Sequence, residues 1–104
     1  MILGYSLVGT KQECGGDEIN IHAELGGLTS IDQCAIACKD LASMFAFGTN
    51  AFGDNRYFRD GGKCLCETAA TNDGTCDITE HMGYNLYRFT NWESGKYQSS
   101  YNTN

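Results

Sequence analysis

Short runs of β-favouring residues recur along this chain, and several alternate between apolar and polar positions, which predicts strands buried on one face. The clearest alternation places Ile19 and Ile21 on one face. The expected strands lie at 2–8, 18–23, 44–47, 56–59, 63–67 and 84–89. Turns rich in Gly, Asn and Asp separate several of them, at 26–27, 50–55 and 60–62. The pattern therefore predicts a protein made largely of short strands.

One stretch has the periodicity of a helix. Apolar residues recur there at spacings of three and four, which predicts a buried helical face over 31–41. Ser30 and Gln33 form a capping box, in which each side chain bonds to the backbone N–H of the other residue. Asp32 lies in the first turn, where the helix dipole favours a negative charge. The residues of the apolar face are Ile31, Cys34, Ala35, Cys38 and Leu41.

Polar segments connect these elements. Residues 11–16 and 68–77 are expected to be loops, and residues 81–83 a turn. The end of the chain is polar and is expected to be a tail that is either disordered or docked on a neighbouring molecule. We therefore divide the chain into a folded domain at 1–89 and a C-terminal tail at 90–104.

Composition narrows the class of protein and of partner. A chain of 104 residues that is 41% apolar fits one globular domain with a modest core. Its 13 acidic and 7 basic residues give a net charge of −6. That charge disfavours nucleic acid and anionic membrane surfaces, because both attract an excess of Lys and Arg. No apolar run reaches the roughly 20 residues that span a bilayer. We therefore expect neither nucleic acid binding nor a membrane span.

Six cysteines in so short a chain indicate disulfides and an oxidising compartment. Cys34 and Cys38 share one face of the expected helix. Cys64 and Cys66 share one face of an expected strand, so two bridges can join the helix to that strand. This geometry permits either pairing of the helical with the strand cysteines. The two remaining cysteines are expected to form the bridge Cys14–Cys76.

A zinc site is the alternative use of these cysteines. Their C-x₃-C and C-x-C spacings differ from the C-x₂-C knuckle of zinc modules. His22 and His81 are further potential ligands, but no pattern positions them, and both are expected at the surface. The sequence has no evident phosphate loop, catalytic triad or scaffolded pair of carboxylates. We therefore expect no metal, no cofactor and no enzymatic activity.

Four segments of the chain resemble PAN/apple domains. Residues 30–38 are similar to the helix of that family, which carries two cysteines four positions apart. Residues 45–47 look like the strand after this helix, 62–66 resemble a later strand that carries cysteine, and 83–87 resemble the closing strand. The resemblance extends over roughly residues 6–89.

The resemblance implies a fold and a class of function. The fold is a small, disulfide-stapled α+β domain in which one helix packs on a curved antiparallel sheet. Members of the family are extracellular modules that bind proteins or carbohydrates and are not enzymes themselves. They commonly carry a cysteine at the position of Met44, as the partner of the second helical cysteine. In this chain the resemblance implies that Cys66 takes its place.

Cationic and aromatic residues provide the candidate ligand site. Arg56, Tyr57 and Arg59 can hold a carboxylate or stack on a sugar. The alternative is an edge strand whose arginines balance an acidic surface. Trp92 follows the last expected strand of the domain and either caps the core or lies on a contact surface.

These patterns support two hypotheses for the function. The first is a secreted binding or adhesion module that recognises carbohydrate or protein. The second is a structural subunit of an extracellular filament or assembly. The apolar segment Ile2–Val8 and the tail that contains Tyr97 and Tyr101 can each add a strand to a neighbouring molecule. The alternative is an N-terminal strand paired within its own sheet and a frayed tail.

Overall fold

The structure is a computed structural model that describes residues 4–27, 29–48, 62–93 and 96–97. The predicted strand at 56–59 lies outside the described residues. The described elements, in chain order, are β1 (Tyr5–Cys14), β2 (Ile19–Asn20), α1 (Ile21–Glu24), α2 (Ile31–Cys38), β3 (Met44–Gly48), β4 (Cys64–Cys66), β5 (Ile78–Phe89), β6 (Trp92–Glu93) and β7 (Lys96–Tyr97).

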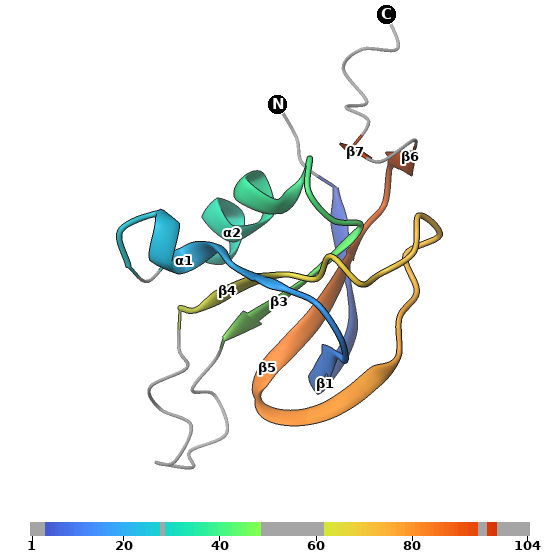
Figure 1. The fold of residues 1–104 in the computed structure, drawn as a ribbon, viewed down its shortest axis with the longest axis horizontal. Helices are drawn as coiled ribbons and strands as arrows, with labels where there is room; N and C mark the ends of the chain where they lie inside the picture. The colour runs from blue at the N-terminus through green and yellow to red at the C-terminus, as the bar shows by residue number, and fades with distance from the viewer. Residues whose placement is uncertain (1–3, 28, 49–61, 94–95, 98–104) are drawn as a thin grey trace, which may run out of the picture.

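One antiparallel sheet forms the body of the domain (Figure 1). Its five strands lie in the order β1-β5-β3-β4-β2. Helix α2 packs against β3 and β4, and the short helix α1 packs against β4 and α2. Strands β6 and β7 form a separate two-stranded sheet beyond the end of β5. The predicted α+β class is confirmed, with α1 as a second, short helix.

Strands β1 and β5 form the longest pair and extend beyond the predicted strands. Residues 11–14 belong to β1, so the predicted loop at 11–16 is wrong over that part. Strand β5 runs through 81–83, so the predicted turn there is also wrong. These residues form strands because each partner strand supplies backbone hydrogen bonds, which no local pattern encodes. The ladder shifts register at Val8 and at Lys11, whose φ of 58° is left-handed.

The predicted strand at 18–23 is confirmed only at residues 19–20. Strand β2 ends at Asn20, and the chain then forms α1, which buries Ile21 in the core. His22, expected at the surface, is half-buried on α1, and its Nδ1 accepts a hydrogen bond from Cys64 N at 3.0 Å. The imidazole thus accepts from the N–H of the first residue of β4, so this N–H does not require β2 to continue as a strand beyond Asn20.

Helix α2 begins where the capping box predicts. Gln33 N donates to Ser30 Oγ at 3.2 Å, and Ser30 N donates to Gln33 Oε1 at 2.8 Å. The helix ends at Cys38, earlier than predicted, and Leu41 is 47% exposed instead of completing the buried face. Tyr5 OH donates to Asp32 Oδ1 at 2.6 Å and links β1 to the first turn of α2.

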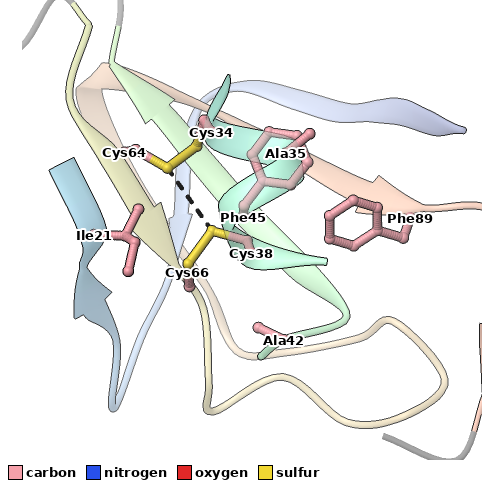
Figure 2. Packing of buried hydrophobic residues seen from close by; sticks show 9 residues of the cluster. All are labelled: Ile21, Cys34, Ala35, Cys38, Ala42, Phe45, Cys64, Cys66 and Phe89. Atoms are coloured by element: carbon pink, nitrogen blue, oxygen red, sulfur yellow. Dashed lines mark hydrogen bonds between the residues drawn. A yellow bond between two sulfur atoms is a disulfide. The ribbon is translucent and has the colours of Figure 1, made fainter. Parts of the chain in front are cut away.

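Two of the three disulfides lie in the core between α2 and β4 (Figure 2). They belong to the same core cluster as Phe45, whose ring stacks on Tyr87 with ring centroids 5.2 Å apart. The structure decides the pairing that the spacing left open, and it confirms the predicted third bridge. The bridges are Cys34–Cys64, Cys38–Cys66 and Cys14–Cys76. Because every cysteine is oxidised, none offers a thiolate to zinc.

Candidate functional site

An open pocket of about 420 Å³ lies at the end of β5 and is the candidate site. The connection between β4 and β5 forms one side of it, and the last residues of β5 with the start of β6 form the other. Figure 1 shows the course of the backbone in these segments. Among the described residues, those that line the pocket are Asn72, Asp73, Gly74, Arg88, Phe89, Thr90 and Trp92.

Trp92 has a fixed orientation in this pocket. Its indole stacks on Phe89, with ring centroids 6.2 Å apart and ring planes at 20°. Its Nε1 donates to Asn72 Oδ1 at 3.0 Å. Phe89 is buried in the core, so the indole rests on a rigid support. Trp92 thus packs against the core, one of the two roles that the sequence left open, and it also lines the pocket.

A hydrogen-bonded turn forms the opposite side of the pocket. Gly74 N donates to Thr71 O at 3.0 Å, and Thr71 N donates to Thr75 O at 2.8 Å. The Ser43 hydroxyl also donates to Thr71 O and ties the turn to the start of β3. The disulfide at Cys76 anchors the chain just after the turn. The polar wall is therefore fixed before any ligand binds.

Arg88 lies across this turn. Its Nη1 donates to Gly74 O at 3.1 Å. Gly74 has a φ of 77°, and a Cβ there would clash with Arg88 Cδ, so both the backbone and the packing require glycine. An Arg guanidinium has five N–H donors, and the bond to Gly74 O uses one of them. The pocket thus combines an oriented cation, the Asp73 carboxylate, an amide and an indole.

The pocket includes one of the predicted ligand-binding residues, Trp92. The other predicted residues, Arg56, Tyr57 and Arg59, lie outside the described residues. Sequence reasoning missed Asp73 and Arg88, because a loop residue and a strand residue meet only through the tertiary fold. The Asn-Asp-Gly turn signal was the only local indication of this wall.

A second, smaller pocket lies on the outer side of α2 and provides a reference surface. It has a volume of about 300 Å³, and Ile36 in it is 54% exposed. Its described lining is mainly apolar and lacks charged side chains: Leu25, Thr29, Gln33, Ile36 and Ala37.

The fold and the pocket define a disulfide-stapled α+β domain with an open polar site. Comparisons with protein-family models, curated proteins and solved structures gave no match. Within the described residues, no helix has the length and apolar character needed to cross a membrane. The three disulfides are typical of an oxidising environment.

Proposed function

We propose that this protein is an extracellular, non-catalytic module that binds carbohydrate in the pocket at Trp92. The pocket carries the proposal because it combines a fixed indole with polar side chains on an open surface. The apolar face of a sugar ring packs on an aromatic ring, while amide, carboxylate and guanidinium groups bond to its hydroxyls. Little side-chain freedom is lost on binding, since Trp92 and Arg88 are already oriented.

The lining of the pocket favours binding over hydrolysis. Asp73 is the one carboxylate among the described residues that line it. Most glycosidases place two carboxyl groups about 5–9.5 Å apart across the bond that they cleave. A site with a single carboxylate suits recognition of hydroxyl groups rather than this chemistry.

The disulfides support the remaining parts of the proposal. Structural disulfides persist in secreted proteins, which supports an extracellular location. The two bridges from α2 to β4 join segments that carry the resemblance to PAN/apple domains. Cys66 bonds to Cys38, the pairing that the resemblance implies where Met44 replaces a cysteine. These features support a PAN/apple-like binding module.

A glycan array probed with the oxidised protein, followed by calorimetric titration of the retained sugars, tests the proposal. Trp92→Ala is expected to weaken binding by about tenfold or more, as loss of a central aromatic anchor typically does. Trp92→Phe keeps the stacking on Phe89 but loses the donor to Asn72, and it is expected to weaken binding less. Ile36→Ala is the control, because it alters only the reference pocket on α2.

Two outcomes would contradict the proposal. Sugar affinity that Trp92→Ala leaves within about twofold of wild type would place the sugar site elsewhere. An array that retains no glycan would argue against carbohydrate and redirect the search to protein ligands of the same pocket.

A structural subunit is the second candidate, and the position of β1 favours it. Strand β1 is outermost in the sheet, and Leu7 on it is 52% exposed. Such an edge can pair with a strand of another copy. The register shifts at Val8 and Lys11 divide β1 into regular segments of at most three residues, which is why we rank the binding module first.

Light scattering across a hundredfold concentration range separates the two candidates. A constant mass near 11.4 kDa corresponds to the monomer and supports the binding module. Large particles that Leu7→Lys abolishes would support assembly through β1, because a charged edge strand resists pairing.

A further inference from the structure

Three carboxylates converge at one end of the sheet, and none of them lines the pocket at Trp92. Glu13 lies near the end of β1, Glu18 in the connection to β2, and Glu67 directly after β4. One carboxylate oxygen from each lies within 4.8 Å of the other two. Residues distant in sequence thus direct like charges to one point.

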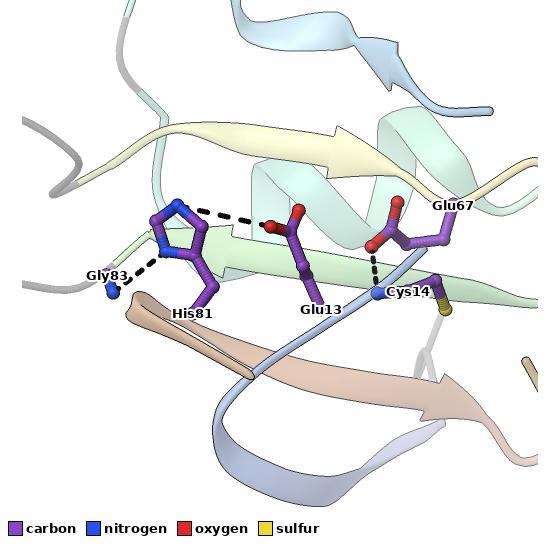
Figure 3. Close-up of polar contacts among 5 residues, drawn as sticks. All are labelled: Glu13, Cys14, Glu67, His81 and Gly83. Carbon is purple, nitrogen blue, oxygen red and sulfur yellow. Dashed lines mark hydrogen bonds and ion pairs between the residues drawn. The ribbon is translucent and has the colours of Figure 1, made fainter. Parts of the chain in front are cut away.

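Glu67 is the unusual member of this acidic cluster. Its side chain is 0% exposed, and its Oε2 accepts a hydrogen bond from Cys14 N at 2.7 Å (Figure 3). Its Oε1 is buried and has no donor among the described residues. A buried carboxylate oxygen without a partner is costly. A proton, a hydrogen-bond donor or a cation beside Oε1 would offset this cost.

The backbone around the cluster keeps the carboxylates together. Glu67 N donates to Met44 O at 3.0 Å, which fixes the residue at the end of the sheet. Ala69 N donates to Asp17 O at 3.1 Å, which holds the connection that carries Glu18 beside the chain after β4. The fold therefore keeps the three carboxyl groups close together.

His81 lies beside the third carboxylate, that of Glu13 (Figure 3). Gly83 N donates to His81 Nδ1 at 3.1 Å, so the neutral ring carries its proton on Nε2. That Nε2 lies 4.0 Å from Glu13 Oε2. Outer groups of this kind commonly position carboxylates that bind a metal. The His81 ring thus lies at the edge of the acidic cluster, beside Glu13.

We propose that Glu13, Glu18 and Glu67 bind one Ca²⁺ ion. A donor set of oxygens alone suits a hard cation, whereas zinc prefers nitrogen and sulfur. With Ca–O bonds of about 2.4 Å, two ligand atoms on one ion lie at most about 4.8 Å apart, which matches the cluster. Mg²⁺ has shorter bonds and usually keeps several waters. The exposed side chain of Glu18 leaves a route for the ion and for waters that complete its coordination.

A proton held between Glu18 and Glu67 is the competing way to relieve the repulsion. It would supply the donor that Oε1 lacks, and it requires no metal. A direct binding measurement separates these two states, because only the calcium site gives saturable binding of added ion.

The test is calorimetric titration of the oxidised, chelator-treated protein with CaCl₂ in 0.15 M NaCl, which screens loose counterion accumulation. We expect one site with a dissociation constant of about 0.1–1 mM, as in extracellular calcium modules, and weaker binding of MgCl₂. Glu67→Gln and Glu18→Gln should each weaken calcium binding by about tenfold or more, since even outer-shell changes cost that much. Glu80→Gln is the control, because Glu80 pairs with Gln12 and is not part of the cluster.

Each outcome decides the proposal. Saturable binding that both cluster variants weaken and the control retains would support it. The exposed Glu18 makes Glu18→Gln informative even if the buried Glu67→Gln variant fails to fold. No saturable heat up to about 10 mM CaCl₂, tenfold above the weakest expected constant, would overturn it. So would equal binding to wild type and Glu18→Gln, or binding of Mg²⁺ as tight as that of Ca²⁺.

Discussion

At the scale of single residues, the fold shifts the pKa of the Glu67 carboxyl group far from its ordinary value. Burial is the main reason that the pKa of Glu67 is raised from 4.5 to about 8; hydrogen bonding with the Glu18 carboxyl group and the negative charges of Glu18 and Glu13 raise it further. The hydrogen bond from Cys14 N acts in the opposite direction and lowers this pKa. Without bound cations, the folded protein therefore holds a proton here at pH values where the unfolded chain has released it.

The sign of the resulting pH dependence follows from linkage. Between pH 4.5 and about 8 the folded state binds more protons at Glu67 than the unfolded state. The contribution of Glu67 to the free energy of unfolding is therefore largest below pH 4.5 and is lost as the pH rises through about 8. Urea unfolding in EDTA across this range measures the loss.

Glu67→Gln is expected to remove this part of the pH dependence and to raise stability at pH 8. The amide oxygen can accept from Cys14 N, and the amide nitrogen can donate to Glu18. Glu80→Gln should retain the wild-type slope. A slope that Glu67→Gln leaves unchanged would assign the pH dependence to other groups.

Gly74 is a second residue at which the surroundings determine how much a substitution lowers stability. Gly74→Ala is expected to cost about 1–2 kcal/mol for the left-handed backbone, and more because the new Cβ displaces Arg88. Gly26→Ala is a matched control, since Gly26 has a φ of 88° but open space around it. Chemical unfolding should show a larger loss for Gly74→Ala, and sugar titration a loss for that variant alone. Equal losses would mean that the Arg88 contact adds nothing.

At the scale of elements, α2 depends on its first turn. The helix has only eight residues, too short to be stable alone, so its cap and its bridges to the sheet hold it. The capping box serves two backbone N–H groups that water would otherwise have to satisfy. Tyr5 adds a hydrogen bond from β1 to Asp32. Burial is the largest cause that raises the pKa of Tyr5 to about 12, and this hydrogen bond is the second largest.

Ser30→Ala is expected to lower the free energy of unfolding by about 1 kcal/mol, because the cap on Gln33 N is lost. For a domain of this length the melting temperature should fall by about 4–8 °C. Ser30→Thr keeps the hydroxyl and should stay much closer to wild type. A Ser30→Ala protein that melts with the wild type would show that the bridges alone fix the helix end.

At the scale of the whole molecule, the three disulfides constrain the chain unequally. Cys14 and Cys76 are 62 positions apart, whereas the two bridges from α2 span 30 and 28 positions and interleave. Once one bridge from α2 is closed, the other closes only a small additional loop. The chain-entropy model therefore assigns the larger single contribution to Cys14–Cys76.

Removing Cys14–Cys76 by a double alanine substitution is expected to cost about 4 kcal/mol. Removing Cys38–Cys66 in the same way should cost about half as much, including the space left by two buried sulfur atoms. Guanidinium unfolding without reductant measures both losses. A larger loss for the Cys38–Cys66 variant would mean that core packing outweighs loop closure. Thiol titration of the denatured, unreduced wild type should detect no free thiol.

The sequence by itself determined the features that depend on near neighbours. The capping box located the start of α2, because both partners lie within one helical turn. The short strands at β3 and β4 were visible as runs of β-favouring residues. The spacing of cysteines within α2 and within β4 predicted which elements are bridged, since spacing fixes which side chains share a face.

Only the tertiary structure decided what depends on residues far apart in the chain. Polar residues such as Gln12 and Glu13 belong to β1 because β5 supplies their backbone partners. His22 lies on α1 instead of the expected strand, and its imidazole accepts from Cys64 N. The choice between two disulfide pairings needed the direction in which α2 crosses β4. The pocket at Trp92 and the acidic cluster at Glu67 bring together side chains from separate elements, so no local pattern encodes them.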